Sequence, residues 1–212
     1  MTLSFTISTL LILSAYLLGS IPTGYLLSRS LKGIDIREHG SGSTGATNVL
    51  RSVGKVPALA VLLIDMLKGS LAVALVNLVY ARLSADLLPA DWQPWLIILT
   101  ALSAIIGHSK SIWLNFTGGK SVATTLGVLF VMNPTVALGT LATFGVILGI
   151  SRIVSLSSIC GAIAVNILML TLNQPVAFSI FAALAGIYVI VRHKTNIQRL
   201  LAGSEPKIGQ AL

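Results

Sequence analysis

Long apolar stretches alternate with short polar breaks along almost the whole chain, from near Leu3 to about Val191. A helix needs about 20 predominantly apolar residues to cross the hydrocarbon core of a bilayer, and stretches of this length recur in the sequence. The pattern predicts an all-α integral membrane protein with seven transmembrane helices, built as one membrane-embedded domain over residues 1–212. We expect the helices near residues 3–28, 55–80, 94–113, 119–132, 135–150, 154–173 and 175–192.

The stretch 119–150 is counted as two helices because of its length. A single helix of roughly 31 residues would be about 46 Å long, against a hydrocarbon core of about 30 Å. Asn133-Pro134 lies near the middle of this stretch and favours a turn.

The positions of the basic residues support the same count. The chain has 14 Lys and Arg against 6 Asp and Glu, a formal net charge of +8, and in membrane proteins such an excess marks cytoplasmic loops. With seven helices and the N-terminus outside, only Arg82, beside Asp86 and Asp91, falls in an outer loop. The inner segments then collect Arg29, Lys32, Arg37, Arg51, Lys55, Lys110, Lys120, Arg152, Arg192, Lys194, Arg199 and Lys207. The expected topology is therefore N-terminus outside and C-terminus cytoplasmic.

Composition excludes several classes of protein. With 55% hydrophobic and only 9% charged residues, the chain is too apolar for a soluble domain. Its basic excess is expected to follow topology rather than to bind nucleic acid. The single cysteine, Cys160, can build neither a disulfide nor a thiolate metal site. We expect no metal site and no cofactor. The stretch before Arg29 lacks a basic start and an A-x-A-like cleavage site, which favours a retained first helix over a signal peptide.

Two polar segments of the cytoplasmic side have the composition of anion-binding loops. The first, Asp35 to Arg51, is rich in Gly, Ser and Thr, and the guanidinium of Arg51 can bind phosphate oxygens in a bidentate way. The second, Gly118-Gly119-Lys120-Ser121, follows Gly107-His108 and leads into an apolar helix, although the Walker A spacing Gly-x4-Gly-Lys is absent. A flexible polar loop and a glycine turn with a snorkelling lysine are the alternatives.

The third polar segment follows the last predicted helix. His193, Asn196 and Arg199 are spaced i, i+3, i+6 and would share one face of a helix at its inner end. Together they offer hydrogen-bond donors to a phosphate or a carbonyl group. A basic cluster at this place is also explained by topology alone.

In these three segments the chain resembles the bacterial acyl-phosphate-dependent glycerol-3-phosphate acyltransferases, and the resemblance covers essentially its whole length. The most specific elements are Gly40-Ser41-Gly42 with Gly45-Ala46-Thr47-Asn48, Gly107-His108 with Phe116-x-Gly-Gly-Lys-x-Val-Ala-Thr, and His193-x-x-Asn196-Ile197-x-Arg199-Leu200-x-x-Gly203-x-Glu205.

The resemblance implies a role for each matching residue. The implied catalytic residues are Ser41, Arg51, Lys120, Ser158, His193 and Asn196. The implied substrate- and phosphate-binding residues are Gly40, Gly42, Thr47, Asn48, Gly118 and Gly119. Glu205 falls on a position that supports the fold. Asp65 and Lys68 also look like a family feature, and as an i, i+3 pair inside a helix they are expected to form a structural ion pair.

Three serines depart from the family's usual pattern. Ser43 stands where Asn is common, Ser111 where Pro is common, and Ser121 where Gly is common. These changes affect the local backbone and remove no charged group. We therefore expect activity to survive, with altered kinetics or a divergent paralogue as alternatives.

The reaction that the resemblance implies is acyl transfer from acyl phosphate to glycerol 3-phosphate, the first step of phospholipid synthesis, on the cytoplasmic side of the cell inner membrane. The expected partners are these two substrates and membrane lipid, with the enzyme that makes acyl phosphate as a candidate partner. The His-x4-Asp pair of thioester-dependent acyltransferases is absent, since the residues five positions after His39, His108 and His193 are Thr44, Trp113 and Gln198. The base is then either the acyl phosphate itself or His193.

Two other functions fit parts of the pattern. An anion transporter would also contain buried charges and helices broken by glycine, but its binding site belongs near the bilayer midplane rather than at one face. An alcohol phosphatidyltransferase needs an aspartate-rich metal site, and the four aspartates here are scattered at positions 35, 65, 86 and 91.

Overall fold

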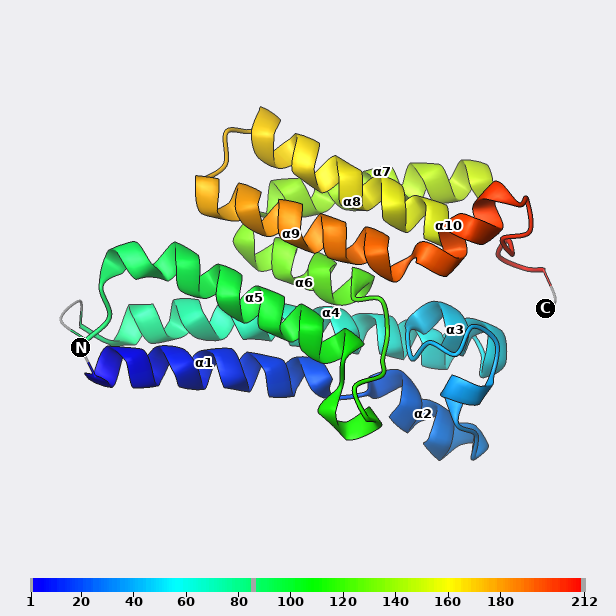
Figure 1. The fold of residues 1–212 in the computed structure, drawn as a ribbon, viewed down its shortest axis with the longest axis horizontal. Helices are drawn as coiled ribbons and strands as arrows, with labels where there is room; N and C mark the ends of the chain where they lie inside the picture. Colours follow the sequence, from blue (N-terminus) through cyan, green and yellow to red (C-terminus); the bar gives the residue numbers. More distant parts are fainter. Residues whose placement is uncertain (1, 85–86, 211–212) are drawn as a thin grey trace. The chain divides into compact units, whose positions relative to one another are not determined.

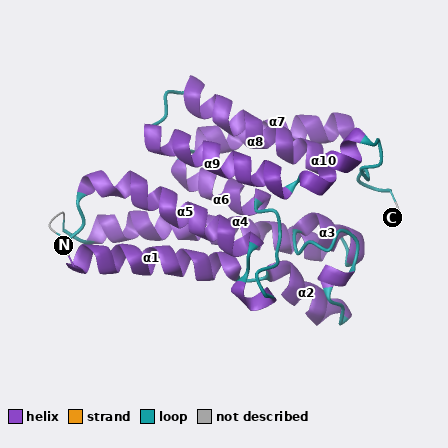
Figure 2. Ribbon diagram, viewed as in Figure 1, coloured by secondary structure: helices purple, strands orange, loops and turns teal. Residues whose placement is uncertain are grey.

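The computed structural model describes residues 2–84 and 87–210, so Asp86 of the expected outer loop lies outside the described residues. The described residues fold into helices joined by loops, with no β-strand among them (Figure 2). The α-helices are α1 (Thr2–Ser20), α2 (Thr23–Lys32), α3 (Ala46–Ser52), α4 (Lys55–Arg82), α5 (Gln93–Ser109), α6 (Val122–Met132), α7 (Pro134–Ser151), α8 (Val154–Thr171), α9 (Val176–Arg192) and α10 (Lys194–Leu201) (Figure 1). Short 3₁₀ helices cover Ile36–Glu38, Ala90–Trp92 and Ile112–Leu114. The chain divides into two compact units, Met1–Met132 and Asn133–Leu212.

The helices confirm a multi-pass, all-α membrane protein. Five helical stretches among the described residues are long and apolar enough to cross a bilayer: Thr2–Lys32, Lys55–Arg82, Ala90–Ser109, Pro134–Ser151 and Val154–Thr171. The bent pair α9 and α10 makes a sixth if it is counted as one span. Helix α6, at the fourth predicted position, has 11 residues. A helix of that length is only about 16 Å long, well short of a hydrocarbon core of about 30 Å.

Small residues bring α1, α4 and α5 close together in the first unit. Ala15, Ala72 and Ala104, one from each helix, form a single buried cluster. The three helices lie side by side in Figure 1. A Cβ atom at Gly19 would overlap the backbone of Ala104, so α1 approaches α5 at a distance that only glycine permits. Close packing through small residues is the usual way in which helices associate in lipid.

The first predicted helix, 3–28, is confirmed as one candidate span, Thr2–Lys32, and is wrong only in its continuity. The chain leaves the helix at Ser20 and begins α2 at Thr23. Pro22 lies at the break and has no N–H with which to continue the helical ladder. The carbonyl oxygen of Ile21 instead accepts a hydrogen bond from Nζ of Lys68 in α4, over 3.1 Å.

The second unit contains α7 to α10 and confirms the predicted division of 119–150. Helix α6 ends at Met132, and Asn133 caps α7 by accepting a hydrogen bond from the N–H of Val136 over 3.0 Å. Pro134 occupies the first position of α7, where the missing N–H costs nothing. The amide of Asn133 also donates to Oε1 of Gln174 in the turn between α8 and α9.

The expected single helix through His193, Asn196 and Arg199 is also wrong. Helix α9 ends at Arg192, and α10 starts at Lys194 with a bend of 60° between the two. His193 lies at the bend, so it does not share a continuous helix with the two residues that follow. Asn196 and Arg199 do lie on one face of α10, where both contact Glu205.

Candidate functional site

The side-chain amide of Asn48 organises the first polar segment. Asn48 is buried, and its Nδ2 atom donates to the carbonyl oxygens of Ile36, His39 and Ser43 over 3.1, 2.9 and 2.9 Å. Its Oδ1 atom accepts from the N–H of Ser41 over 3.0 Å. Both ends of the amide are thus bound to the loop backbone, which gives Asn48 a role in shaping the loop.

The loop turns around Asn48 through two glycines. Gly40 and Gly42 have φ angles of +57° and +68°, a left-handed conformation that glycine adopts at little cost. A Cβ atom at Gly40 would also collide with Oδ1 of Asn48. Ser41, which lies between these glycines, is exposed, and Thr47 is half-buried in the first turn of α3. The loop therefore presents the Ser41 hydroxyl to solvent.

Arg37 and Arg51 hold different positions in this segment. Arg37 forms a bidentate pair with Asp35, with 2.6 Å between Nη2 and Oδ2, and its guanidinium also lies over the ring of Tyr25. The hydrogen bonds from Arg37 lower the pKa of the Asp35 carboxyl below its ordinary value. Arg51 lies half-buried in the last turn of α3.

The second polar segment folds back against the end of α5. The N–H of Ser111 donates to the carbonyl of Thr117, and the N–H of Gly119 donates to the carbonyl of His108 over 3.2 Å. Gly118 and Gly119 are therefore held beside His108 by the backbone itself, and a Cβ atom on either glycine would overlap that residue. Lys120 follows directly and is half-buried, two residues before α6 begins.

The three serines that depart from the family pattern all have hydrogen bonds in the structure. The hydroxyl of Ser43 accepts from the N–H of Gly45, and that of Ser111 donates to the carbonyl of Ser20. Ser121 has a φ angle of +63°, in the region that favours glycine, and its hydroxyl donates to the carbonyl of Ile105 over 2.7 Å. The serine thus offsets with a buried hydrogen bond the strain that glycine would avoid.

The predicted ion pair between Asp65 and Lys68 is present, with 2.8 Å between Oδ1 and Nζ. Both residues are buried in α4. The sequence did not indicate that His108 of α5 would join them, yet its Nδ1 atom lies 3.6 Å from the same oxygen of Asp65. The motif Gly107-His108 drew attention to this histidine but did not indicate its contact with Asp65.

The third polar segment is built around the carboxylate of Glu205 in the second unit. Oε1 accepts from Nδ2 of Asn196 over 2.6 Å and from the hydroxyl of Ser155 over 2.7 Å. Oε2 accepts from Nε of Arg199 over 2.7 Å. Burial alone would raise the pKa of Glu205, but these hydrogen bonds hold it below its ordinary value. The carboxylate ties the start of α8 and two positions of α10 to the C-terminal segment.

His193 and Ser158 are both buried. His193 lies at the bend before α10, and Ser158 lies in the second turn of α8. Nδ1 of His193 lies 2.7 Å from the carbonyl oxygen of Val189. Because a carbonyl oxygen only accepts, Nδ1 is the nitrogen that donates in this hydrogen bond. The hydroxyl of Ser158 donates to the carbonyl of Val154, so its oxygen retains acceptor capacity.

Comparison with known proteins shows the family of the chain. Residues 9–203 match the family model described as glycerol-3-phosphate acyltransferase. The chain belongs to the glycerol-3-phosphate acyltransferase family.

Relatives of that family align over nearly the full chain. The glycerol-3-phosphate acyltransferase of Rippkaea orientalis is 68% identical over 210 residues, which cover 99% of this chain and 97% of the relative. The one from Synechocystis sp. is 58% identical, covering 99% and 95% of the two chains. A crystal structure of PlsY, an integral membrane glycerol 3-phosphate acyltransferase in its glycerol 3-phosphate form, is 36% identical with a TM-score of 0.85, covering 95% of this chain and 96% of that one. The lysophosphatidic acid form of PlsY has a TM-score of 0.83 at 36% identity, covering 95% of each chain.

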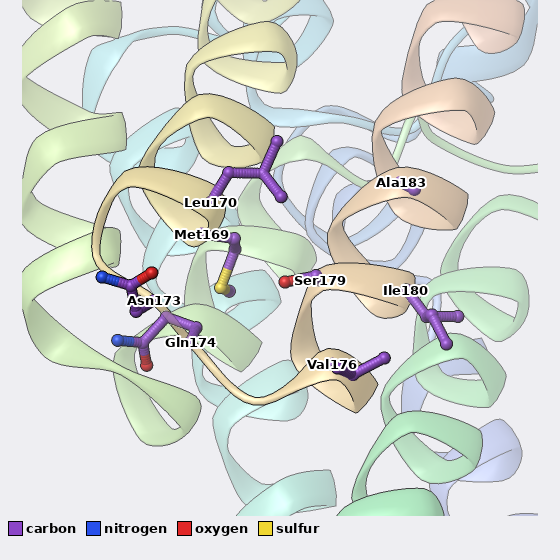
Figure 3. A pocket seen from close by; sticks show the side chains of 8 residues that line it. All are labelled: Met169, Leu170, Asn173, Gln174, Val176, Ser179, Ile180 and Ala183. Atoms are coloured by element: carbon purple, nitrogen blue, oxygen red, sulfur yellow. The ribbon is translucent and has the colours of Figure 1, made fainter.

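The third polar segment lies away from a cavity of about 440 Å³ in the same unit. Figure 3 shows this cavity at the turn between α8 and α9, with Met169, Asn173 and Ser179 among the side chains that line it. It adjoins the start of α9, whereas His193 follows the end of that helix, about 25 Å away at 1.5 Å per residue. Size alone therefore does not assign this cavity to the acyl-transfer chemistry.

Proposed function

We propose that the chain transfers an acyl group from acyl phosphate to the sn-1 hydroxyl of glycerol 3-phosphate, giving 1-acyl-glycerol 3-phosphate and inorganic phosphate. The observation that carries this proposal is the similarity to PlsY, whose two solved forms are a glycerol 3-phosphate form and a lysophosphatidic acid form. These two compounds differ by one acyl group, so they are the acceptor and the product of a single acyl transfer.

Acyl phosphate is the donor that suits the residues of this chain. The sequence has no His-x4-Asp pair to activate the acceptor alcohol, so the reaction depends on a donor with a good leaving group. A mixed anhydride with phosphate provides one. Its phosphate oxygens also supply negative charge for the same kind of loop that binds glycerol 3-phosphate.

Basic residues and glycine loops of the first unit bind the anionic ends of the substrates in this proposal. Lys120 and Arg51 neutralise phosphate charge, and the amides of Gly118 and Gly119 donate to phosphate oxygens. The loop shaped by Asn48 adds the exposed hydroxyl of Ser41. Their contribution is proximity and electrostatic stabilisation rather than a covalent intermediate.

The third polar segment and Ser158 act on the acceptor hydroxyl of glycerol 3-phosphate and on the negative charge that develops during the transfer. The acceptor oxygen attacks the acyl carbonyl carbon, the bond from that carbon to the phosphate oxygen breaks, and phosphate leaves with the electron pair. The hydroxyl proton passes to Nε2 of His193 or to a phosphate oxygen of the donor. Asn196 and Ser158 orient the hydroxyl or stabilise the oxyanion, and Glu205 holds Asn196 in place.

The same proposal gives the protein its place in the cell. The chain is one membrane-embedded acyltransferase domain of the inner membrane with seven spans, its N-terminus outside and its C-terminus and active site in the cytoplasm. The basic residues of the polar segments support this orientation. The product stays in membrane lipid, and the enzyme that makes acyl phosphate is the partner that must supply the donor.

The test is an assay of the purified protein in detergent, with glycerol 3-phosphate and either acyl phosphate or acyl-CoA. We expect acyl phosphate to give lysophosphatidate and one inorganic phosphate per turnover, and acyl-CoA to give neither. Lys120→Ala should lose at least about 90% of this turnover, because a charge-assisted contact contributes about 1.5–3 kcal/mol. Equal turnover with acyl-CoA would contradict the donor assignment, and no turnover with either donor would favour a transporter.

A further inference from the structure

Three ionisable side chains that the proposed reaction does not use are buried together in the first unit. Asp65, Lys68 and His108 are 2%, 3% and 6% exposed. Nζ of Lys68 and Nδ1 of His108 lie 2.8 Å and 3.6 Å from the same oxygen, Oδ1 of Asp65. A buried ion pair seldom adds net stability over apolar residues of similar volume. Stability alone therefore does not account for this buried pair.

The imidazole of His108 lies between Asp65 and the glycine loop. Its Nδ1 side faces the carboxylate, and its Nε2 edge lies where a Cβ atom of residue 119 would be, so Gly119 rests directly on the ring. Gly118 rests on the main chain of the same residue, because its Cβ atom would overlap the carbonyl oxygen of His108. Side chain and backbone of one residue thus set the position of two consecutive loop residues.

The cluster is anchored to a third helix. Nζ of Lys68 donates to the carbonyl of Ile21 over 3.1 Å, at the break between α1 and α2. Asp65 is thereby fixed from α4 and from α1, and the ring that faces it is fixed in turn. The contacts thus form one connected series that ends at Gly119.

We propose that Asp65 and His108 are positioning residues for the loop Gly118–Lys120, with the imidazole as the surface that sets where the backbone of Gly119 lies. The inference rests on the proposed function in one respect, that this loop binds the phosphate of glycerol 3-phosphate. Neither residue touches the substrate. Both act through the placement of the loop amides and of Lys120.

A double-mutant cycle tests the contact. Gly119→Ala places a methyl group against the ring, displaces the loop and should raise KM for glycerol 3-phosphate about ten-fold or more, since a misplacement of about 1 Å costs up to about 100-fold. KM for acyl phosphate should change less than about three-fold. His108→Ala alone should raise KM for glycerol 3-phosphate several-fold, because the loop loses the ring that positions it. In that background the methyl has room, so adding Gly119→Ala should raise KM little further. His108→Asn, which keeps an amide to face Asp65 and removes the Nε2 edge, should have the same effect and serves if His108→Ala folds poorly.

Gly118→Ala is the matched control. Its methyl meets the carbonyl oxygen of His108, which remains in every variant of that residue. Gly118→Ala should therefore be as defective with His108→Ala as without it. Multiplicative effects in the Gly119 cycle, or an equally small effect of Gly118→Ala in the His108→Ala background, would overturn the proposal.

The ion pair is tested by replacing it with apolar residues of similar volume, Asp65→Leu/Lys68→Met. Such replacements often preserve stability. We expect the variant to keep the thermal unfolding midpoint of the wild type while KM for glycerol 3-phosphate rises several-fold. An unchanged KM would remove Asp65 from the proposal.

Binding of glycerol 3-phosphate, measured as the shift it causes in the unfolding midpoint, separates this inference from the proposed function. If the wild type does not turn over acyl phosphate, the donor assignment is wrong. The double-mutant cycle can then still be read from the binding of glycerol 3-phosphate. If the wild type does not bind glycerol 3-phosphate at all, the loop assignment and this inference fall together.

Discussion

At the scale of single residues, polar side chains of the motifs act on the backbone around them. Asn48 uses both ends of its amide to close the loop that presents Ser41. A hydrogen bond of this kind contributes about 1 kcal/mol, and a buried amide left unpaired costs about 1–3 kcal/mol. The position therefore requires an amide, whether or not that amide also contacts substrate.

Ser121 gives a residue-scale prediction because it combines a strained backbone with a compensating bond. Its φ of +63° costs a non-glycine residue about 1–2 kcal/mol. The bond from its hydroxyl to the Ile105 carbonyl offsets about 1 kcal/mol of that cost. Ser121→Ala keeps the strain and loses the bond, so it should destabilise the protein by about 1 kcal/mol. Ser121→Gly loses both and should be near neutral.

The measurement is the thermal unfolding midpoint of the three proteins in one detergent. We expect the wild type and Ser121→Gly to agree and Ser121→Ala to unfold at a lower temperature. An alanine variant at least as stable as the glycine variant would show that the left-handed backbone carries no strain here.

The chemistry of these residues could be predicted from the sequence better than their partners. Motifs marked Ser121 as a departure and predicted a site role for Asn48, since both inferences depend on residue type and spacing. The carbonyls that Asn48 binds come from Ile36, His39 and Ser43, which a loop brings together only after it has folded. The contact of His108 with Asp65 joins two helices and has no local sequence signature.

At the scale of elements, the length of the apolar stretches predicted where the helices lie, and local breaks in the helices changed where they begin and end. The division at Asn133-Pro134 was predictable because capping and proline chemistry are local. The break at Pro22 has the same local cause and was missed because the apolar pattern runs through it. The bend of 60° at His193 has no proline or glycine to mark it, whereas the bonds that Glu205 makes to α10 are tertiary and have no local sequence signal.

Glu205 gives an element-scale prediction, since its carboxylate joins α8, α10 and the C-terminal segment. Its hydrogen bonds lower its pKa below the ordinary 4.5, so the stabilisation is fully present above pH 4.5. It is lost as pH falls through the lowered folded-state pKa. Glu205→Gln removes this carboxylate and should unfold at a lower temperature at pH 7, with the difference narrowing as pH falls below 4.5.

The measurement is the unfolding midpoint of both proteins from pH 7 down to well below the ordinary pKa of 4.5. Glu38→Gln is the matched control, because Glu38 is exposed and the same amide replaces its carboxylate. That variant should follow the wild type throughout. A gap between Glu205→Gln and the wild type that stays constant with pH would contradict the assigned role of the charge.

At the scale of the whole molecule, charge and apolar length give partly different answers. Within residues 2–84 and 87–210, length and composition support five spans, or six with α9 and α10, because α6 has only 11 residues. The basic residues favour seven, since this count leaves Arg82 alone among them on the outer side. Family membership was predictable because the three motifs are specific in residue type and order. The number of spans therefore depends on α6, which is too short for a full crossing by its 11 residues but must cross if the basic residues are to lie inside.

Cysteine labelling decides between these counts. In a Cys160→Ser background, we expect Ser43→Cys and Ser204→Cys to react only with reagents that reach the cytoplasm, and Asp86→Cys to react with an impermeant reagent added outside. The reason is that seven spans place every basic polar segment inside, where basic loops are retained.

If α6 and α7 form one crossing, the C-terminal segment lies outside, and Ser204→Cys reacts with the impermeant reagent while Ser43→Cys does not. Outside labelling of Ser43→Cys would instead reverse the orientation and remove the first polar segment from the cytoplasmic face. In that case acyl phosphate made in the cytoplasm would have no access to Arg51, and the proposed function would fail with the topology.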